Sequence, residues 1–183
     1  MSLQKNQIKK GGAFLIEETR PDDVFTPEDF SEEQLMMKST LQDFIDREVW
    51  PHKHRFENKD YEFTKSLMKQ AGEMGFLGVA VPEQYGGLGM DFVSTMLVCD
   101  YISGASGSLS TAFGAHTGIG TLPITLYGTE EQKAKYVPKL ASGEWFGAYC
   151  LTEPGAGSDA NSGKTKAVLS EAGDHYRSSG QNR

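Results

Sequence analysis

The residues best suited to chemistry lie in the stretch Tyr149–Asp159, which reads Tyr-Cys-Leu-Thr-Glu-Pro-Gly-Ala-Gly-Ser-Asp. Its glycines lack the side chains that would keep a ligand away from the backbone, so the N–H groups of this loop suit phosphate or another anion. Thr152 and Ser158 add hydroxyl donors. The stretch therefore predicts an anion-binding loop. An ordinary strand-to-turn connection, which uses the same residue types, is the alternative.

The run just before the loop, Glu144–Tyr149, alternates and carries three aromatic residues, which predicts a β-strand leading into it. Two common phosphate-binding motifs do not fit. No Gly-Lys-Ser/Thr follows the glycines, so the loop is not a P-loop, and it does not open a βαβ unit as a dinucleotide fingerprint does.

Amphipathic helices must position this loop. A capping box from Ser31 to Gln34 predicts the start of the first helix, which Trp50-Pro51 is expected to end. The basic run His52–Arg55 that follows is interpreted as a solvated helix end, with an anion site as the alternative. The predicted buried face of this helix consists of Leu35, Met37, Leu41, Phe44, Ile45 and Val49.

Two further helices are expected next. One runs from about Tyr61 to Met74, and Gly75 suits its C-cap. Asp91 is expected to cap the other, which runs through about Ser103. Its predicted buried face carries Phe92, Met96, Leu97 and Tyr101. Between the two helices, a bend that needs positive φ is predicted at Gly86, Gly87 and Gly89.

The apolar segment Ser108–Tyr127 carries several glycines. Glycine costs about 1 kcal/mol relative to alanine in a helix interior, so a helix here needs a compensating reason. That reason is either close contact with another helix or room for a slim ligand. His116 lies on this helix and is interpreted as a structural, hydrogen-bonded histidine, with a catalytic role as the alternative.

The last helix starts at a second capping box, Thr129 to Gln132, and Pro138 is expected to bend or end it. Strands then follow, as a hairpin of residues 165–169 and 175–178. The predicted fold is therefore mainly α, a helical bundle domain followed by the beginning of a truncated β domain. We expect a polar lead-in arm at residues 1–25, an all-helical domain at 26–142 and the first β strands at 143–183.

Composition narrows the partners and the location. The chain has 183 residues and a net charge of −7, which argues against nucleic acid and anionic membranes as partners. No segment approaches the ~20 apolar residues of a membrane span, and no Cys/His spacing suggests a metal site. Cys99 and Cys150 both lie in apolar runs, so buried thiols in a reducing compartment are expected. A cytoplasmic, bacterial-type protein is predicted, with the mitochondrial matrix as the alternative.

Four stretches resemble, in order and spacing, motifs of the acyl-CoA dehydrogenase family. They are the flavin-binding signature (Tyr149–Asp159), the loop after the second helix (Gly78–Asp91), the helix leading into the signature (Gly128–Glu144) and the first hairpin of the β domain (Lys164–Gln181). The resemblance covers roughly residues 30 to 181 and is greatest to the long- and very-long-chain type.

This resemblance implies FAD as cofactor and an acyl-CoA substrate that is desaturated between its α and β carbons. It implies that Tyr149, Leu151 and Thr152 line the flavin ring. Gly157 and Ser158 would approach the pyrophosphate, and Ser158 would also lie near the CoA arm. Electrons would leave to an electron-transfer flavoprotein, and the full-length protein would be a homo-oligomer.

The glycine-rich helix would form the base of the acyl pocket in such a protein. The small residues Ala115, Gly114 and Gly118 imply by this resemblance a deep pocket that takes a long acyl chain. These three residues are therefore the expected substrate-binding positions on this helix.

The family's catalytic glutamate lies in a carboxy-terminal bundle that has no counterpart in these 183 residues. We therefore expect no catalytic residue in this chain, which would be inactive by itself, and Glu153 and Asp159 are expected to stabilise the loop. One alternative is an acyl-CoA oxidase or flavin monooxygenase on the same scaffold. Another is a non-catalytic binding or assembly fragment.

Overall fold

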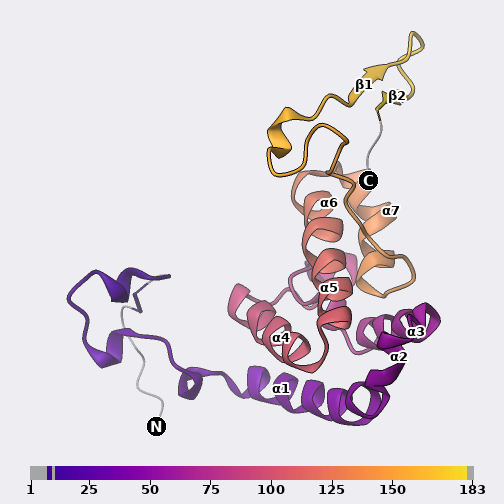
Figure 1. The fold of residues 1–183 in the computed structure, drawn as a ribbon. Coiled ribbons are helices and arrows are strands. Elements are labelled where there is room, and N and C mark those ends of the chain that lie inside the picture. Colours follow the sequence, from indigo (N-terminus) through magenta and orange to yellow (C-terminus); the bar gives the residue numbers. More distant parts are fainter. Residues whose placement is uncertain (1–7, 10, 181–183) are drawn as a thin grey trace.

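The computed structural model describes residues 8, 9 and 11–180, which form a bundle of helices followed by a small hairpin (Figure 1). The helices are α1 (Glu32–Phe44), α2 (Lys53–Glu57), α3 (Tyr61–Glu73), α4 (Phe92–Ala105), α5 (Gly107–Gly114), α6 (Leu122–Tyr127) and α7 (Glu130–Ala141), and the strands are β1 (Lys166–Leu169) and β2 (Tyr176–Ser179). The predicted fold class, mainly α with the start of a β domain, is confirmed.

Side-chain caps fix where the helices begin. Ser31 Oγ accepts from the Gln34 amide over 3.1 Å, and Gln34 Oε1 accepts from the Ser31 amide over 3.0 Å. Thr129 and Gln132 make the same reciprocal pair at the start of α7, over 3.2 and 2.9 Å. Asp91 caps α4 by accepting from the Ser94 amide over 2.8 Å. Each cap satisfies amides that the first helical turn leaves without partners, and all three predicted starts are confirmed.

The main core lies between α1, α3, α4 and α5. Its most deeply buried apolar side chains include Leu41, Val49, Leu67, Val98, Ile102 and Leu109. On α1 the predicted face is confirmed except for Leu35, which is 46% exposed. On α4 the prediction is wrong for Phe92 and Met96, which are exposed. The buried stripe of α4 continues along Leu97, Val98, Ile102 and Ala105 instead.

Proline positions explain two irregular helical stretches. The π-helical residues Ile45–Val49 and Ala115–Thr121 each end two residues before a proline, Pro51 and Pro123. Proline has no N–H, and its ring clashes with the carbonyl four residues earlier. A wider turn relieves this clash, so the helical path continues. The first helix therefore passes through a short turn at Trp50–His52 into α2 rather than ending at Pro51.

The effect of the proline inside α7 differs from the prediction. The helix does not end or break at Pro138 but continues to Ala141. Val137, Leu140 and Ala141 are buried around it, and Val137 and Ala141 pack with Val81. Burial of this apolar face offsets the hydrogen bond that proline removes.

The loop between α3 and α4 depends on glycine in two ways. Gly75, Gly86 and Gly89 have φ of +84°, +82° and +61°, as predicted. Gly87 does not have a positive φ. A Cβ at Gly87 would lie 2.1 Å from the Val81 carbonyl oxygen, so close backbone contact, and not φ, requires glycine there.

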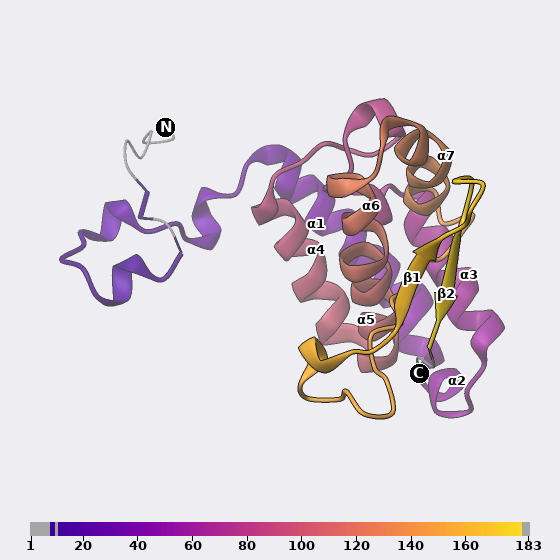
Figure 2. The ribbon, with the colours of Figure 1, turned by 90° about the horizontal axis from the view of Figure 1, so that it is seen from above.

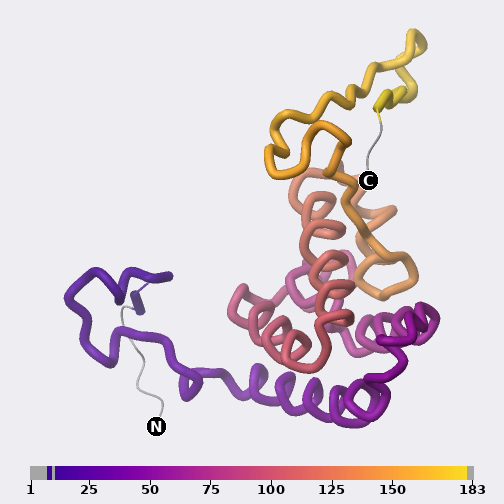
Figure 3. The backbone as a smooth tube through the Cα atoms, in the orientation of Figure 1, coloured from indigo at the N-terminus to yellow at the C-terminus, as the bar shows by residue number. Residues whose placement is uncertain are grey.

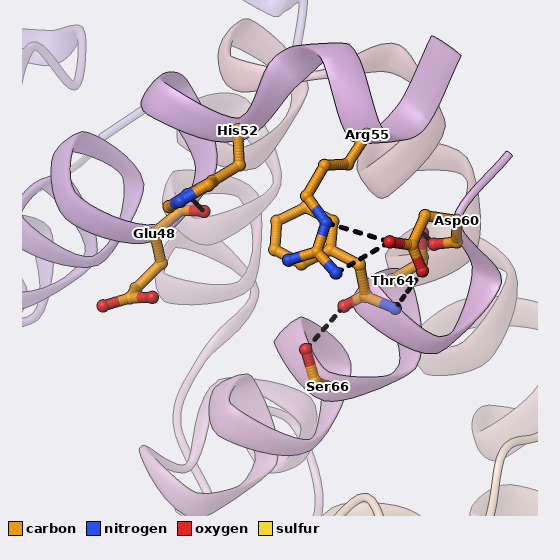
Figure 4. A network of polar contacts seen from close by, with 7 residues as sticks. Glu48, His52, Arg55, Asp60, Thr64 and Ser66 are labelled. Atoms are coloured by element: carbon orange, nitrogen blue, oxygen red, sulfur yellow. Dashed lines mark hydrogen bonds and ion pairs between the residues drawn. The ribbon is translucent and has the colours of Figure 1, made fainter. Parts of the chain in front are cut away.

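The corner between α2 and α3 is closed by an ion pair (Figure 4). Arg55 Nε and Nη2 donate to Asp60 Oδ2 over 2.9 and 2.7 Å, and the Arg55 guanidinium lies 4.1 Å from the centre of the Phe63 ring. The Phe63 amide, followed by Arg55, lowers the pKa of the Asp60 carboxyl. Because Arg55 is engaged in this way, the structure does not support an anion site at His52–Arg55.

The β-hairpin is confirmed, and its register pairs Lys166 with Ser179 and Leu169 with Tyr176. Both strands are exposed on both faces. The views in Figures 1 and 2 place the hairpin beyond the α6 and α7 end of the bundle. Residues 11–24 also extend away from the bundle in both views, and the rest of the predicted lead-in, residues 1–7 and 10, lies outside the described residues. The boundary at residue 142 stays a prediction.

Candidate functional site

The stretch before the loop is extended but is not a β-strand, so that prediction is wrong. Two of its amides bond to helical residues, and none is paired with a neighbouring strand of the described chain. The Trp145 amide donates to the Lys139 carbonyl over 3.0 Å, and the Gly147 amide donates to His116 Nδ1 over 2.9 Å. Figure 3 shows the chain turning back after α7 and running beside it toward the loop next to α6.

The signature loop Tyr149–Asp159 lies on the surface. Its residues Leu151, Thr152, Gly157 and Ser158 are exposed, and only Ala156 is buried. Glu153 and Ala156 exchange two backbone hydrogen bonds of 3.1 Å, which form a tight turn. Among the described residues, the amides of Thr152, Gly157 and Ser158 have no hydrogen-bond acceptor. These donors therefore face outward, as the anion-binding prediction requires.

Glu153 holds the two ends of the loop region together. Its carboxylate accepts from the amides of Lys164 and Thr165 over 2.7 and 2.9 Å. Hydrogen bonding from the Thr165 side chain, and then from these amides, lowers the pKa of the Glu153 carboxyl. Asp159 accepts from the Ser162 hydroxyl, and its carbonyl accepts from the Ser162 amide over 3.1 Å. Both carboxylates are thus engaged in local structure, in line with the expected loop-stabilising role.

Two apolar side chains flank the outward amides. Tyr149 is 56% exposed and Leu151 is 45% exposed. Large apolar side chains are not buried here against the rest of the described chain, so they are available to cover a flat ligand. The structure brings them together with Thr152 in one exposed stretch. Gly157 and Ser158 follow after the turn.

His116 joins three segments and is 1% exposed. The Gly147 amide donates to its Nδ1, so this nitrogen carries the lone pair. Its Nε2 lies 3.0 Å from the Leu140 carbonyl oxygen, which can only accept, so Nε2 carries the proton. Burial lowers the pKa of this imidazole, and the Leu140 carbonyl opposes that change in part. The predicted structural, hydrogen-bonded histidine is therefore confirmed as a neutral ring.

Two glycines let the backbone of the extended stretch touch the π-helical segment. A Cβ at Gly120 would lie 2.5 Å from the Gly147 carbonyl carbon, and a Cβ at Gly147 would lie 2.9 Å from the Gly120 carbonyl carbon. The Phe146 ring lies edge-on to the His116 ring, with their centres 5.8 Å apart. Close backbone contact thus explains one glycine of the Ser108–Tyr127 helix.

Open space beside the backbone explains two other glycines of this helix, Gly114 and Gly118. A Cβ at Gly114 or Gly118 would meet no atom within 4 Å. Both residues line a cavity of about 390 Å³ between α4, the residues after α3 and the glycine-rich helix. The cavity walls are mostly apolar and include Phe76, Leu77, Val79, Phe92, Met96 and Phe113. Ala115 is not among the lining residues, so the structure brings only two of the three predicted substrate positions to this cavity.

The cysteines and other metal-binding side chains add little to the site. Cys99 is partly buried, and burial raises the pKa of its thiol. Cys150 is exposed, so the prediction of a buried thiol is wrong there, because the extended stretch lies on the surface. Within the described part of the chain, no group of His, Cys, Asp and Glu side chains is arranged to hold a metal ion. None of the helices described is both long and apolar enough to cross a membrane.

Sequence reasoning missed the contact of Gly120 with Gly147 and the two amides held by Glu153. Those partners are 27 and about a dozen residues apart along the chain, so local patterns give no sign of them. A usable signal for the first contact was present. Gly147 interrupts an otherwise aromatic run, and isolated glycine in such a run often marks close backbone approach.

Comparison with known proteins gives consistent matches over these elements. Residues 31–144 match the family model "Acyl-CoA dehydrogenase, N-terminal domain". The chain is 51% identical over 181 residues to a probable acyl-CoA dehydrogenase of Bacillus subtilis, covering 99% of this chain and 30% of the relative. It is 39% identical over 147 residues to mitochondrial isovaleryl-CoA dehydrogenase of Bos taurus, and the match covers 80% of this chain and 34% of that relative.

A solved structure of an acyl-CoA dehydrogenase complexed with FAD from Bacillus anthracis superposes with a TM-score of 0.87. It is 50% identical to this chain and is matched over 95% of this chain and 30% of its own. The chain thus spans about a third of the length of the curated relatives it matches.

Proposed function

Because the chain belongs to the acyl-CoA dehydrogenase family, we propose that it is the amino-terminal part of an FAD-dependent enzyme that desaturates an acyl-CoA between its α and β carbons. The observation that carries this proposal is the exposed loop Tyr149–Asp159, whose outward amides lie beside uncovered apolar side chains.

The residues of the loop fit FAD in chemistry. The amides of Thr152, Gly157 and Ser158 would donate to the flavin edge and the pyrophosphate, with hydroxyls of Thr152 and Ser158 as further donors. Tyr149 and Leu151 would cover the ring. A Cβ at Gly157 would meet no atom within 4 Å, so this glycine leaves open the approach to the neighbouring amides. When bound, FAD supplies the hydride acceptor for the reaction.

The acyl chain is proposed to lie in the apolar cavity beside Gly114 and Gly118. Its volume of about 390 Å³ is in the range of ligand pockets, and its walls are apolar. Because Gly114 and Gly118 have no side chains, they leave room in the cavity, and this supports a slim, long acyl chain as the ligand. The relatives include an isovaleryl-CoA dehydrogenase, so the long-chain preference rests on this cavity and not on the family match.

Three further proposals follow from the family resemblance. The enzyme passes electrons to an electron-transfer flavoprotein, it acts as a homo-oligomer at full length, and it works in the bacterial cytoplasm. Glu153 is not proposed as the base that removes the α-proton, since its carboxylate is already bound to the Lys164 and Thr165 amides.

Titration of the purified chain with FAD tests the proposal. Saturable quenching of flavin fluorescence is expected for the wild type. Gly157→Leu should weaken binding at least tenfold, because its side chain covers the amides of the loop. Gly104→Leu is the matched control, since Gly104 lies in α4, is exposed, and a Cβ there also meets no atom within 4 Å. Wild-type chain that FAD does not saturate would contradict FAD binding by this chain.

A further inference from the structure

One well-defined anchor of the extended stretch lies just before the signature loop. Gly147 is hydrogen-bonded to His116, and Glu153 is paired with Ala156 on the far side of the stretch. Between these points, Ala148, Tyr149, Leu151 and Thr152 make no backbone hydrogen bond to a described residue. The position of Gly147 therefore helps to set where the chain enters the loop.

The anchor is made by a buried side chain with two different partners. His116 Nδ1 accepts from Gly147, and Nε2 donates to the Leu140 carbonyl at the end of α7. A neutral imidazole has one donor and one acceptor on opposite sides of a rigid ring, so it can hold two backbone segments at a fixed separation. The backbone contact of Gly120 with Gly147 then leaves the segment no room to move toward the helix.

The π-helical turn also fixes the histidine. The Thr121 hydroxyl donates to the His116 carbonyl over 2.7 Å, and Thr121 is 1% exposed. The backbone of His116 is thus held within the widened turn, and its imidazole is held by two other segments. This arrangement is rigid in the way a residue that orients a ligand site must be.

We infer that His116 is a positioning residue for the cofactor loop: through the Gly147 amide it fixes the path of Ala148–Thr152 and so the place of the donors that would meet FAD. The inference rests on the proposed function for its ligand, while the anchor itself is a property of the chain without ligand. His116 makes no hydrogen bond with the loop donors, so it is proposed to act on them through the Gly147 amide.

Two substitutions separate the two hydrogen bonds. His116→Asn places an amide oxygen near the position of Nδ1, so it can keep the Gly147 bond and lose the Leu140 bond. His116→Gln places an amide nitrogen near the position of Nε2, so it can keep the Leu140 bond and lose the Gly147 bond. Both remove the ring, so a purely structural role predicts similar losses for the two variants.

FAD affinity and amide hydrogen exchange in the ligand-free chain are the two measurements. His116→Gln is expected to weaken FAD binding about tenfold and to speed hydrogen exchange at the Gly147 amide. His116→Asn is expected to stay within about threefold of the wild type in both. Equal FAD affinity in the two variants, or unchanged exchange at Gly147 in His116→Gln, would overturn the inference.

The exchange measurement keeps the inference separate from the proposed function. If the wild type does not bind FAD, the proposed function fails for this chain, and the Gly147 exchange still decides the role of His116. If either variant does not fold, nitrogen NMR of the wild-type imidazole decides instead. Protonated Nε2 and unprotonated Nδ1 support the anchor, and the opposite tautomer overturns it.

Discussion

The Gly147 amide donates to His116 Nδ1 over 2.9 Å and links residues 31 positions apart in the sequence. Gly147 belongs to the extended stretch before the signature loop, and His116 belongs to the glycine-rich helix. This one bond therefore joins the two parts of the chain that the proposed function needs, the cofactor loop and the helix beside the apolar cavity.

Backbone contact between Gly120 and Gly147 should make Gly120→Ala destabilising. The added Cβ would lie 2.5 Å from the Gly147 carbonyl carbon, so the extended stretch must shift. We expect a loss of about 1–3 kcal/mol in the free energy of unfolding, measured by urea denaturation. Gly114→Ala is the control, because its Cβ meets open space and alanine favours the helix by up to about 1 kcal/mol. Equal effects of the two changes would contradict this account.

Protonation of His116 should destabilise the fold as the pH falls. Burial lowers the pKa of this imidazole below its ordinary value of 6.5, so the unfolded chain takes up the proton first. The contribution of this imidazole to the free energy of unfolding is therefore fully present above about pH 6.5. It decreases below that pH, by at most about 1.4 kcal/mol per pH unit for this one group.

Urea denaturation between pH 5 and 7.5 measures that slope, and His116→Gln supplies the comparison because its amide does not titrate. A slope that is the same in the wild type and in His116→Gln would assign it to other groups.

Local signals in the sequence predicted the local structure well. The capping boxes at Ser31 and Thr129 involve residues three apart, and the positive φ of Gly75, Gly86 and Gly89 follows from single residues and their turns. The helical course of Ser108–Tyr127 was also predicted, but contact with another helix does not explain Gly120. The structure shows close contact of Gly120 with the extended stretch at Gly147, and open space at Gly114 and Gly118.

The errors arose where distant partners decide the outcome. The alternating pattern of Glu144–Tyr149 fits a strand, but its amides meet Lys139 and His116, so it has no strand partner. Pro138 stays within α7 because the burial of Val137 and Ala141 against Val81 outweighs the missing amide. A pattern within one segment cannot show which other segment covers it.

Removal of the Glu153 carboxylate should loosen the end of the loop region. Glu153→Ala leaves the Lys164 and Thr165 amides without their acceptor, so faster hydrogen exchange is expected at both. Glu171→Ala is the matched control, because Glu171 is exposed in the hairpin turn. In the wild type, hydrogen exchange at the Lys164 and Thr165 amides should also speed up as the pH falls below about 4.5. The rates are compared after correction for the intrinsic exchange rate at each pH. The lowered pKa of Glu153 keeps its carboxylate charged above that range.

The apolar cavity should set how long an acyl chain the protein holds. Gly118→Leu places a side chain in the cavity, whereas Ala115→Leu adds the same side chain at a position that does not line it. With FAD present, Gly118→Leu is expected to weaken binding of a sixteen-carbon acyl-CoA about tenfold, because each buried methylene that is displaced costs about 0.8 kcal/mol. Binding of a four-carbon acyl-CoA should change less than about threefold, since a short chain leaves the far end of the cavity empty.

Calorimetric titration of the two acyl-CoA compounds gives both affinities for the wild type and each variant. Ala115→Leu is expected to match the wild type for both chain lengths. The reverse pattern, a selective loss of long-chain binding in Ala115→Leu with none in Gly118→Leu, would place the acyl chain on another face of the helix. Equal losses for long and short chains in Gly118→Leu would mean that the substitution perturbs the fold, and the cavity would then have no part in selecting chain length.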